Sequence, residues 1–190
     1  MTLKLITAPT VEPITLAEAK LHLRVDAATE DAMITDMIFA ARQAAEGELN
    51  RALITQTWER VLDAFPASYL PLGMPPVVSV QSVTYIDPAG ATQTLSGGAY
   101  TLDSDRDPGW LLPAYGTAWP ATRYQANAVR VRFNCGYGGT AAAVPQAIRQ
   151  WLLVRIGTLY QFREAFVAGG LAALPNRFVD GLLDRYRVYA

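Results

Sequence analysis

The chain has 190 residues, of which 51% are hydrophobic, enough apolar material for the core of one compact domain. Only 17% are charged and the net charge is −1, so the composition gives no electrostatic basis for nucleic-acid binding and favours a protein that buries surface against partners. The single cysteine excludes an internal disulfide and a multi-cysteine metal site. No apolar run has the length of a signal peptide or a membrane span, so we expect a protein made in the cytoplasm.

The first part of the chain predicts an arm followed by two helices. Residues 1–14 contain two prolines and no helical period, which predicts an extended arm that stays mobile until a partner orders it. Thr15 and Glu18 have the spacing of a capping box, and Thr29 is the expected N-cap of a second, longer helix. The turn between these helices is short, which predicts an antiparallel helical hairpin over residues 15–55.

The middle of the chain, residues 56–139, is predicted to be a small antiparallel β-domain inserted between helices. Runs rich in β-branched residues predict strands over residues 57–65, 77–86, 91–95, 99–103 and 128–135. The last of these is the clearest, because apolar side chains alternate with Arg130 and Arg132. The proline-containing residues 66–76 and 105–126 predict irregular segments.

The last third of the chain returns to helical patterns. Pro145 suits the first turn of a long helix over residues 144–168, which would complete the helical core. Residues 169–190 predict a linker and a short terminal helix. The expected fold class is therefore α+β, a single structural unit in which a helical hairpin and C-terminal helices form the core and carry the β insertion.

Catalytic chemistry has little support in the sequence. A nucleophile needs a positioned base, and the only histidine, His22, lies between Leu21 and Leu23, which favours a packed or half-exposed histidine. Cys135 shares the inward phase of the last strand, which favours a small core residue. A hydrolase would rest on these two residues and scattered acids, so we expect no enzymatic activity and no cofactor.

Two further patterns admit both a functional and a structural interpretation. Asp103, Asp105 and Asp107 resemble the start of a calcium loop, but no glutamate closes the loop and Pro108 interrupts it, so we expect a solvated acidic loop and no metal. Four aromatic side chains of the irregular segment are suited to stack on sugars or bases: Trp110, Tyr115, Trp119 and Tyr124. We favour the interpretation that they hold this segment in place, and keep a carbohydrate- or ligand-binding module as the alternative function.

Short motifs follow one another in a characteristic order along the chain. They are ITLAEAK at 14–20, LRV at 23–25, ED at 30–31, AAR at 40–42 with Glu46, RALITQTW at 51–58, PVVSV at 76–80, YID at 85–87, GTAWP at 116–120, GYG at 136–138, VP at 144–145, Tyr160, RE at 163–164, LL at 182–183 and YR at 186–187. In this order they resemble the head–tail connector (adaptor) family of tailed phages and gene transfer agents.

The resemblance implies a structural subunit without catalysis. Such a subunit would form a ring beneath the portal protein, with the portal's twelve-fold symmetry, and would join it to the stopper or other tail-side proteins. DNA would pass through the ring without specific binding, and no membrane would be involved. The protein would lie at the head–tail junction of a virion or phage-like particle that is assembled in the bacterial cytoplasm.

Two groups of residues are the candidates for contacts in such an assembly. The terminal helix would dock onto a neighbour or the portal through Phe178, Leu182 and Tyr186, because a short amphipathic helix is marginal alone. Removing the chain after Pro175 would then block assembly and leave the fold intact. Four charged residues are candidates to bridge subunits, with exposed ion pairs inside the hairpin as an equal alternative: Arg24, Asp31, Arg42 and Glu46.

Overall fold

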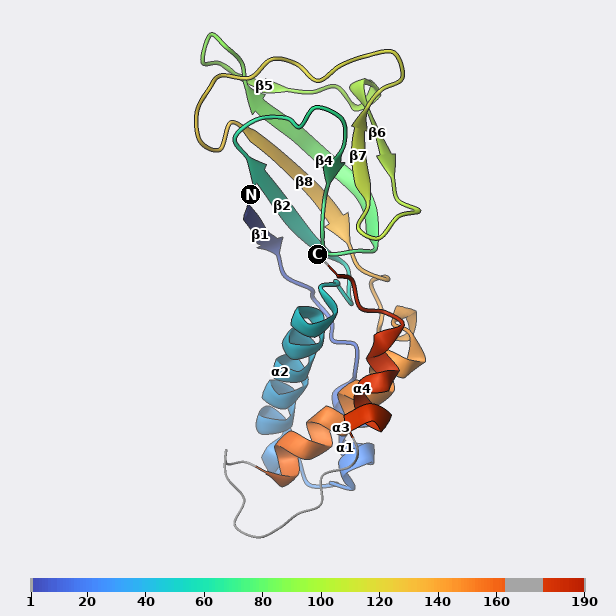
Figure 1. The fold of residues 1–190 in the computed structure, drawn as a ribbon. Coiled ribbons are helices and arrows are strands. Elements are labelled where there is room, and N and C mark those ends of the chain that lie inside the picture. Colours follow the sequence, from blue (N-terminus) through green and yellow to red (C-terminus); the bar gives the residue numbers. More distant parts are fainter. Residues whose placement is uncertain (1, 163–175, 190) are drawn as a thin grey trace. The chain divides into compact units, whose positions relative to one another are not determined.

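The computed structural model describes residues 2–162 and 176–189, except for the side chains of residues 176–178 and 180 (Figure 1). The chain forms two compact units and is an α+β protein. The β unit comprises residues 1–9 and 55–137, and the helical unit comprises residues 10–54 and 138–190. In the described ranges, no helix is both long enough and apolar enough to cross a membrane.

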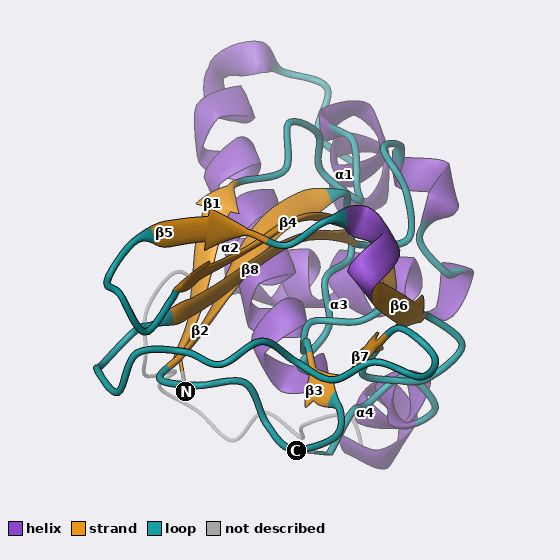
Figure 2. Cartoon of the chain, turned by 90° about the horizontal axis from the view of Figure 1, so that it is seen from above, coloured by secondary structure: helices purple, strands orange, loops and turns teal. Residues whose placement is uncertain are grey.

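A five-stranded antiparallel sheet forms the larger part of the β unit (Figure 2). Its strands are β1 (Thr2–Thr7), β2 (Gln56–Leu62), β4 (Val77–Ile86), β5 (Thr92–Thr94) and β8 (Val129–Cys135), in the order β1-β2-β8-β4-β5. The alternation predicted for β8 is confirmed, because Val129, Val131, Phe133 and Cys135 are all completely buried. Phe133 lies opposite Trp58 on β2 and Val80 on β4, so β8 is the central strand of this core.

A second, three-stranded sheet has the order β3-β7-β6. Its strands are β3 (Leu70–Pro71), β6 (Tyr100–Asp103) and β7 (Trp110–Pro113), and the 3₁₀ turn Gly97–Ala99 precedes β6. Leu70, Leu72 and Leu111 are fully buried there. The prediction of an irregular segment over residues 105–126 is wrong for β7, because its antiparallel pairing with β6 supplies a partner that a local proline signal does not reveal.

The start of the chain is also part of the β unit. The prolines of residues 1–14 predict an arm that awaits a partner, but Thr2–Thr7 form β1 and pair with β2 in the register Thr2–Val61 to Leu5–Trp58. The β unit is therefore not a single insertion into a helical core. The pairing partner lies more than fifty residues away, which explains why the local pattern does not reveal this strand.

Four α-helices form the helical unit (Figure 1). They are α1 (Leu16–Leu23), α2 (Asp31–Leu49), α3 (Gln146–Gln161) and α4 (Asn176–Asp184), with 3₁₀ turns at Ala28–Glu30 and Ala141–Ala143. α2 packs against α1 and α3, and α4 packs against α3. The completely buried side chains between them include Ala19, Ile34, Ala41, Ala45, Leu49, Ile148 and Ile156. On α2 and α3 these residues belong to the apolar stripe of the helix.

The helix starts agree only in part with the predicted caps. The capping box of α1 is present, because the Thr15 hydroxyl accepts from the Glu18 amide at 3.2 Å and the Glu18 carboxylate accepts from the Thr15 amide at 2.9 Å. Thr29 is not the N-cap of α2: it lies inside the 3₁₀ turn, and Glu30 takes the cap position without a side-chain bond. Of the predicted helix over 144–168, the structure has α3 at Gln146–Gln161, with Pro145 at the cap position before it, and residues 163–168 lie outside the described residues.

Candidate assembly surfaces

A buried ion pair on α2 holds two connecting segments of the helical unit. Arg42 is 4% exposed, and its guanidinium lies 2.8 Å from the Glu46 carboxylate and 2.7 Å from that of Glu12. The second oxygen of Glu46 accepts from the backbone amide of Leu53 at 2.9 Å. Arg42 and Glu46 are therefore bound inside the chain. The predicted alternative of an ion pair inside the hairpin is found for Arg42 and Glu46, but the pair is buried rather than exposed.

The other two charged candidates lie at the turn between α1 and α2. Asp31 pairs with Lys20, whose ammonium also donates to the Ala27 carbonyl at 3.0 Å, so this carboxylate joins α1 to α2 within the chain. Arg24 ends α1 in the left-handed conformation, with φ 59°, and its side chain is exposed. Among the described residues, no side chain bonds to its guanidinium. Arg24 is thus the most exposed of the four predicted charges, whereas the Asp31 side chain is half-buried.

The terminal helix already has a place within its own chain. Leu183 is completely buried, whereas Leu182 and Tyr186 are half-buried. The side chain of Phe178 lies outside the described residues. Within the chain α4 packs on α3, and its completely buried residue is Leu183, one position from the predicted Leu182. The docking of this helix onto a neighbour or the portal stays a prediction.

The residues after α4 bind the end of α2. The amide of Val188 donates to the Leu49 carbonyl at 3.0 Å, and the Val188 carbonyl accepts from the Asn50 side chain at 3.0 Å. Arg51 donates to the Tyr186 carbonyl at 3.0 Å, and its side chain is largely buried there. The expectation that removal of the chain after Pro175 leaves the fold intact is therefore not compatible with these contacts.

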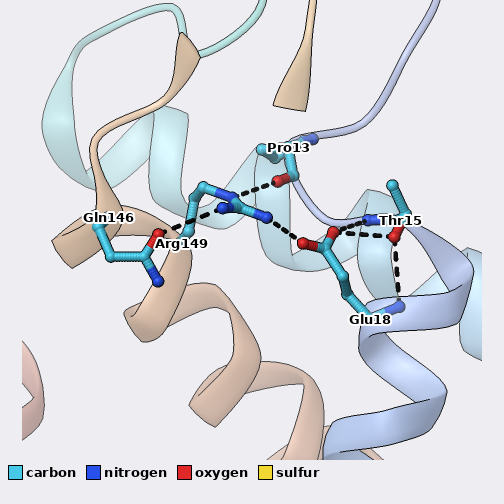
Figure 3. A network of polar contacts seen from close by, with 5 residues as sticks. All are labelled: Pro13, Thr15, Glu18, Gln146 and Arg149. Carbon is cyan, nitrogen blue, oxygen red and sulfur yellow. Dashed lines mark hydrogen bonds and ion pairs between the residues drawn. The ribbon is translucent and has the colours of Figure 1, made fainter. Parts of the chain in front are cut away.

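A second polar network joins the starts of α1 and α3 (Figure 3). Arg149 on α3 forms an ion pair with Glu18 and donates to the Pro13 carbonyl at 3.1 Å and to the Gln146 side chain at 3.2 Å. The hydrogen bond from the Thr15 amide, aided by Arg149, holds the pKa of Glu18 below its ordinary value although partial burial acts to raise it. One carboxylate thus caps α1 and fixes it to α3.

A depression of about 330 Å³ lies beside this network, between α1 and α3. Its lining residues are Glu18, Leu21, His22, Gln146, Arg149 and Leu153. Leu21 is 82% exposed, and His22 is exposed as well, which corrects the prediction of a packed or half-exposed histidine. The depression thus has both apolar and polar walls.

In the β unit, one face of the large sheet carries a charge cluster. The pairing register places Glu59 on β2 opposite Arg132 on β8, and Arg130 and Arg132 bind its two oxygens at 2.9 and 3.0 Å. Burial acts to raise the pKa of Glu59, but the hydrogen bonds from Arg132 and Arg130 outweigh it and lower that pKa. The two arginines are thereby partly neutralised by the chain itself.

The aromatic side chains of residues 105–126 are mostly bound to their own chain. The ring of Trp110 stacks on Tyr69 at 3.8 Å between centroids, and that of Trp119 stacks on Phe65 at 4.8 Å. These contacts support the interpretation that the tryptophans hold the segment in place. The remaining two of the predicted set are fully exposed: Tyr115 and Tyr124.

The acidic loop between β6 and β7 binds within itself. One oxygen of Asp103 accepts from Arg106 at 2.8 Å and the other from the amide of Asp105 at 3.2 Å. Within residues 2–162 and 176–189, no group of three or more His, Cys, Asp or Glu side chains is arranged to hold a metal ion. Cys135 is completely buried, as expected for a core residue.

Part of the chain matches the sequence model of a known protein family. Residues 13–89 match the model of the phage gp6-like head-tail connector proteins. The resemblance seen in the ordered motifs is thus confirmed, and the matched region contains α1, α2 and strands β2 to β4. No curated protein matches the chain in sequence.

Three solved structures of gene transfer agent (GTA) particles contain chains whose fold is similar to that of this chain over nearly their whole length. Against a chain from the neck of an empty GTA particle computed with C6 symmetry, the TM-score is 0.83 at 25% identity, covering 100% of this chain and 97% of that chain. A chain from the virion of a native GTA particle gives 0.82 at 26% identity with the same coverage. A chain from the neck of a native GTA particle computed with C12 symmetry gives 0.75 at 26% identity, again over 100% and 97%.

The sequence pattern does not reveal the depression between α1 and α3. Its residues come from two helices that are separated by more than a hundred positions, and the pocket exists because these helices pack at their starts. A hint was present in Leu21, which lies outside the apolar stripe formed by Leu16, Ala19 and Leu23. An exposed leucine on a short helix suggests a contact surface only once its neighbours on another helix are known.

Proposed function

We propose that this protein is a structural subunit of the head–tail junction of a GTA or phage-like particle. In this proposal the subunits form a ring beneath the portal protein and join it to the stopper or other tail-side proteins. The observation that carries the proposal is the likeness to a GTA neck chain over 100% of this chain and 97% of that chain, with a TM-score of 0.83. The match of residues 13–89 to the head-tail connector proteins supports the same role.

Twelve copies per ring are the proposed stoichiometry. The similar neck chains come from particles computed with C6 and with C12 symmetry, and both are compatible with twelve subunits. A closed ring requires a heterologous contact, in which two different surfaces of each subunit meet. The helical unit has such surfaces on different helices, because α2 has its own outer face and α1 and α3 enclose a depression.

The charge of the chain suits a conduit through which DNA passes. A strongly basic lining would hold the phosphate backbone by counterion release, whereas this chain has a net charge of −1. The basic side chains of the sheet face, Arg130 and Arg132, are paired with Glu59. We therefore propose that DNA is a passing contact, and that the subunit has neither catalytic nor membrane-binding activity. Assembly would take place in the bacterial cytoplasm.

Removal of the gene from a particle-producing host tests this function. Without the subunit, heads and tails should accumulate separately, and the wild-type gene supplied from a plasmid should restore joined particles. Electron microscopy of the two populations provides the readout. Joined, tailed particles in the deletion strain at the wild-type frequency would overturn the proposal.

A further inference from the structure

One face of the large sheet keeps an excess of positive charge. The pairing register places Lys4, Glu59 and Arg132 in one row across β1, β2 and β8, and Arg130 lies two positions before Arg132 on the same face. The side chain of Glu59 is 8% exposed, whereas those of the two arginines that bind it are 43% exposed. Three cations against one carboxylate give this basic face, formed by Lys4, Arg130 and Arg132, a net charge of +2.

The basic face still has hydrogen-bond donors for a partner. Glu59 accepts one bond from each guanidinium, at 2.9 and 3.0 Å, and a guanidinium has five N–H groups. The ammonium of Lys4 is exposed, and no carboxylate of the described residues forms an ion pair with it. The neighbouring strand β4 adds hydroxyl groups, because Ser82 and Thr84 lie opposite the two arginines. Such groups are suited to bind carboxylates.

The acidic loop between β6 and β7, residues 103–107, has the opposite charge. It contains three carboxylates and one guanidinium, which gives a net charge of −2. Asp103 forms an ion pair with Arg106, whereas Asp105 and Asp107 are exposed. Among the described residues, no group bonds to the carboxylate of Asp105. The charge of this loop is thus equal in size and opposite in sign to that of the basic face.

The acidic loop lies on the other side of the large sheet. Arg60 and Tyr85 point away from the basic face, because their partners on β8 alternate with the two arginines. Arg60 donates to the Leu72 carbonyl at 3.3 Å, and the Tyr85 ring meets that of Phe65 at 5.8 Å between centroids. These contacts place the segment of β3, with its partners β7 and β6, over the opposite face. A copy therefore cannot place its acidic loop on its own basic face.

We propose that the acidic loop of one copy binds the basic face of the next copy, with Asp105 beside Lys4. This inference rests on the proposed function, because it supplies the contact between copies that a ring requires. Two different surfaces on opposite sides of one unit are suited to a closed, head-to-tail ring. The charges would orient the copies, and the surrounding contacts would supply most of the affinity, because exposed ion pairs contribute little.

The phosphate groups of DNA are the other anions that suit the basic face. A second copy is favoured, because every copy carries a loop whose charge of −2 matches the +2 of the face. A face of this charge left open to DNA in every subunit would hold the phosphate backbone by counterion release, which opposes the passage of DNA. Acidic loops that cover the basic faces leave the conduit close to neutral.

Zero-length cross-linking with a carbodiimide tests the contact in purified wild-type particles. The reagent joins an amine to a carboxylate that touches it, and the lysines of the chain are Lys4 and Lys20. We expect a product of twice the subunit mass in which the peptides of Lys4 and Asp105 are joined. Lys4→Arg is the matched control: it keeps the charge but removes the amine, so this product should disappear. The link of Lys20 to Asp31 within the chain shows that the reagent has acted.

Each outcome separates the contact from the proposed function. If the subunit is present in the necks and Lys4 joins another protein, a different carboxylate of this chain or nothing, the contact is wrong and the proposed function stands. The same holds if formaldehyde joins the Lys4 peptide to DNA in filled particles, because the basic face would then bind DNA. If antibodies do not find the wild-type subunit in the necks, the proposed function fails, and the contact that rests on it fails as well.

A double-mutant cycle gives a second test. Lys4→Gln and Asp105→Asn should each lower the amount of subunit in purified particles by about two- to fivefold, as expected for one lost ion pair. The double variant should lose no more than either single variant, because both changes remove the same pair. Arg123→Gln, which removes an exposed positive charge elsewhere in the β unit, is the control and should have little effect. Losses that multiply in the double variant would overturn the pairing of Asp105 with Lys4.

Discussion

Arg42 contributes its charge inside the chain rather than at a surface. It joins α2 to the segment before α1 through Glu12, while its partner Glu46 binds the segment that leaves α2 through the Leu53 amide. Buried ion pairs are sensitive to the loss of one partner, because the remaining charge stays in a poorly solvated place. The two residues therefore organise the connections of the helical unit.

We predict that Arg42→Ala lowers the free energy of unfolding of the helical unit by about 3–5 kcal/mol, because it removes the buried cation that pairs with both Glu12 and Glu46. Urea denaturation followed by circular dichroism at 222 nm measures this change. Arg24→Ala is the matched control, since its side chain is exposed, and we expect a change within about 0.5 kcal/mol. Equal effects of the two substitutions would contradict the role assigned to the buried pair.

Glu59 makes the stability of the β unit depend on acid pH. Its pKa is lowered in the folded protein, so its stabilising effect is complete above the pKa of the unfolded chain and is lost as the pH falls through the folded pKa. We predict that stability falls more steeply between about pH 5 and pH 3 in the wild type than in Glu59→Gln. Thermal unfolding at a series of pH values measures the two slopes, with Asp105→Asn as the control carboxylate. Parallel slopes for wild type and Glu59→Gln would show that the two arginines do not stabilise this carboxylate.

Some helices and strands have a local sequence pattern that predicts them, whereas others depend on pairing with a strand that is remote in the sequence. The capping box of α1 and the alternation of β8 could be predicted, because the stabilising groups lie within a few residues or in a strict period of two. β1 and β7 could not, because both depend on pairing with strands that are remote in the sequence or masked by prolines. Thr29 was a plausible N-cap of α2, but it lies inside a 3₁₀ turn, and the Asp31 amide after this turn donates to the Ala28 carbonyl.

The packing of α4 could be predicted only as a helix with an apolar side. The spacing of Phe178, Leu182 and Tyr186 indicated one face, whereas the burial of Leu183 depends on where α3 lies. The hydrogen bonds of Tyr186 and Val188 with the end of α2 carry no sequence signal, because these two residues contribute backbone atoms. The terminal helix is therefore part of the helical unit rather than a free arm.

We predict that Leu183→Ala lowers the free energy of unfolding by about 2–5 kcal/mol, as expected when a completely buried leucine is truncated. Leu182→Ala, at the neighbouring half-buried position, should cost distinctly less. Thermal unfolding of both variants checks the order. If Leu182→Ala were the more destabilising change, α4 would pack through the face predicted from the sequence.

At the scale of the whole molecule, the family can be predicted from sequence motifs, whereas the exposed surfaces can be identified only from the packing of the helices. The ordered motifs from residue 14 onwards indicated a head–tail connector, and the match of residues 13–89 agrees. The candidate contact residues were harder to predict, because charged residues such as Arg42 and Asp31 form ion pairs within the chain. Which apolar side chains remain exposed, such as Leu21, depends on the packing of helices that are far apart in the sequence.

Electron cryo-microscopy of intact particles from the host of this protein tests the central claim most directly. Particles would carry an epitope tag at the C-terminus of this chain, with untagged particles as the control, and the junction would be reconstructed without imposed symmetry. The account predicts a closed ring between the portal and the tail-side proteins, into which both units of this chain fit, with tag density on the ring. A junction whose density is fully explained by other proteins, with no tag in the particle, would contradict it.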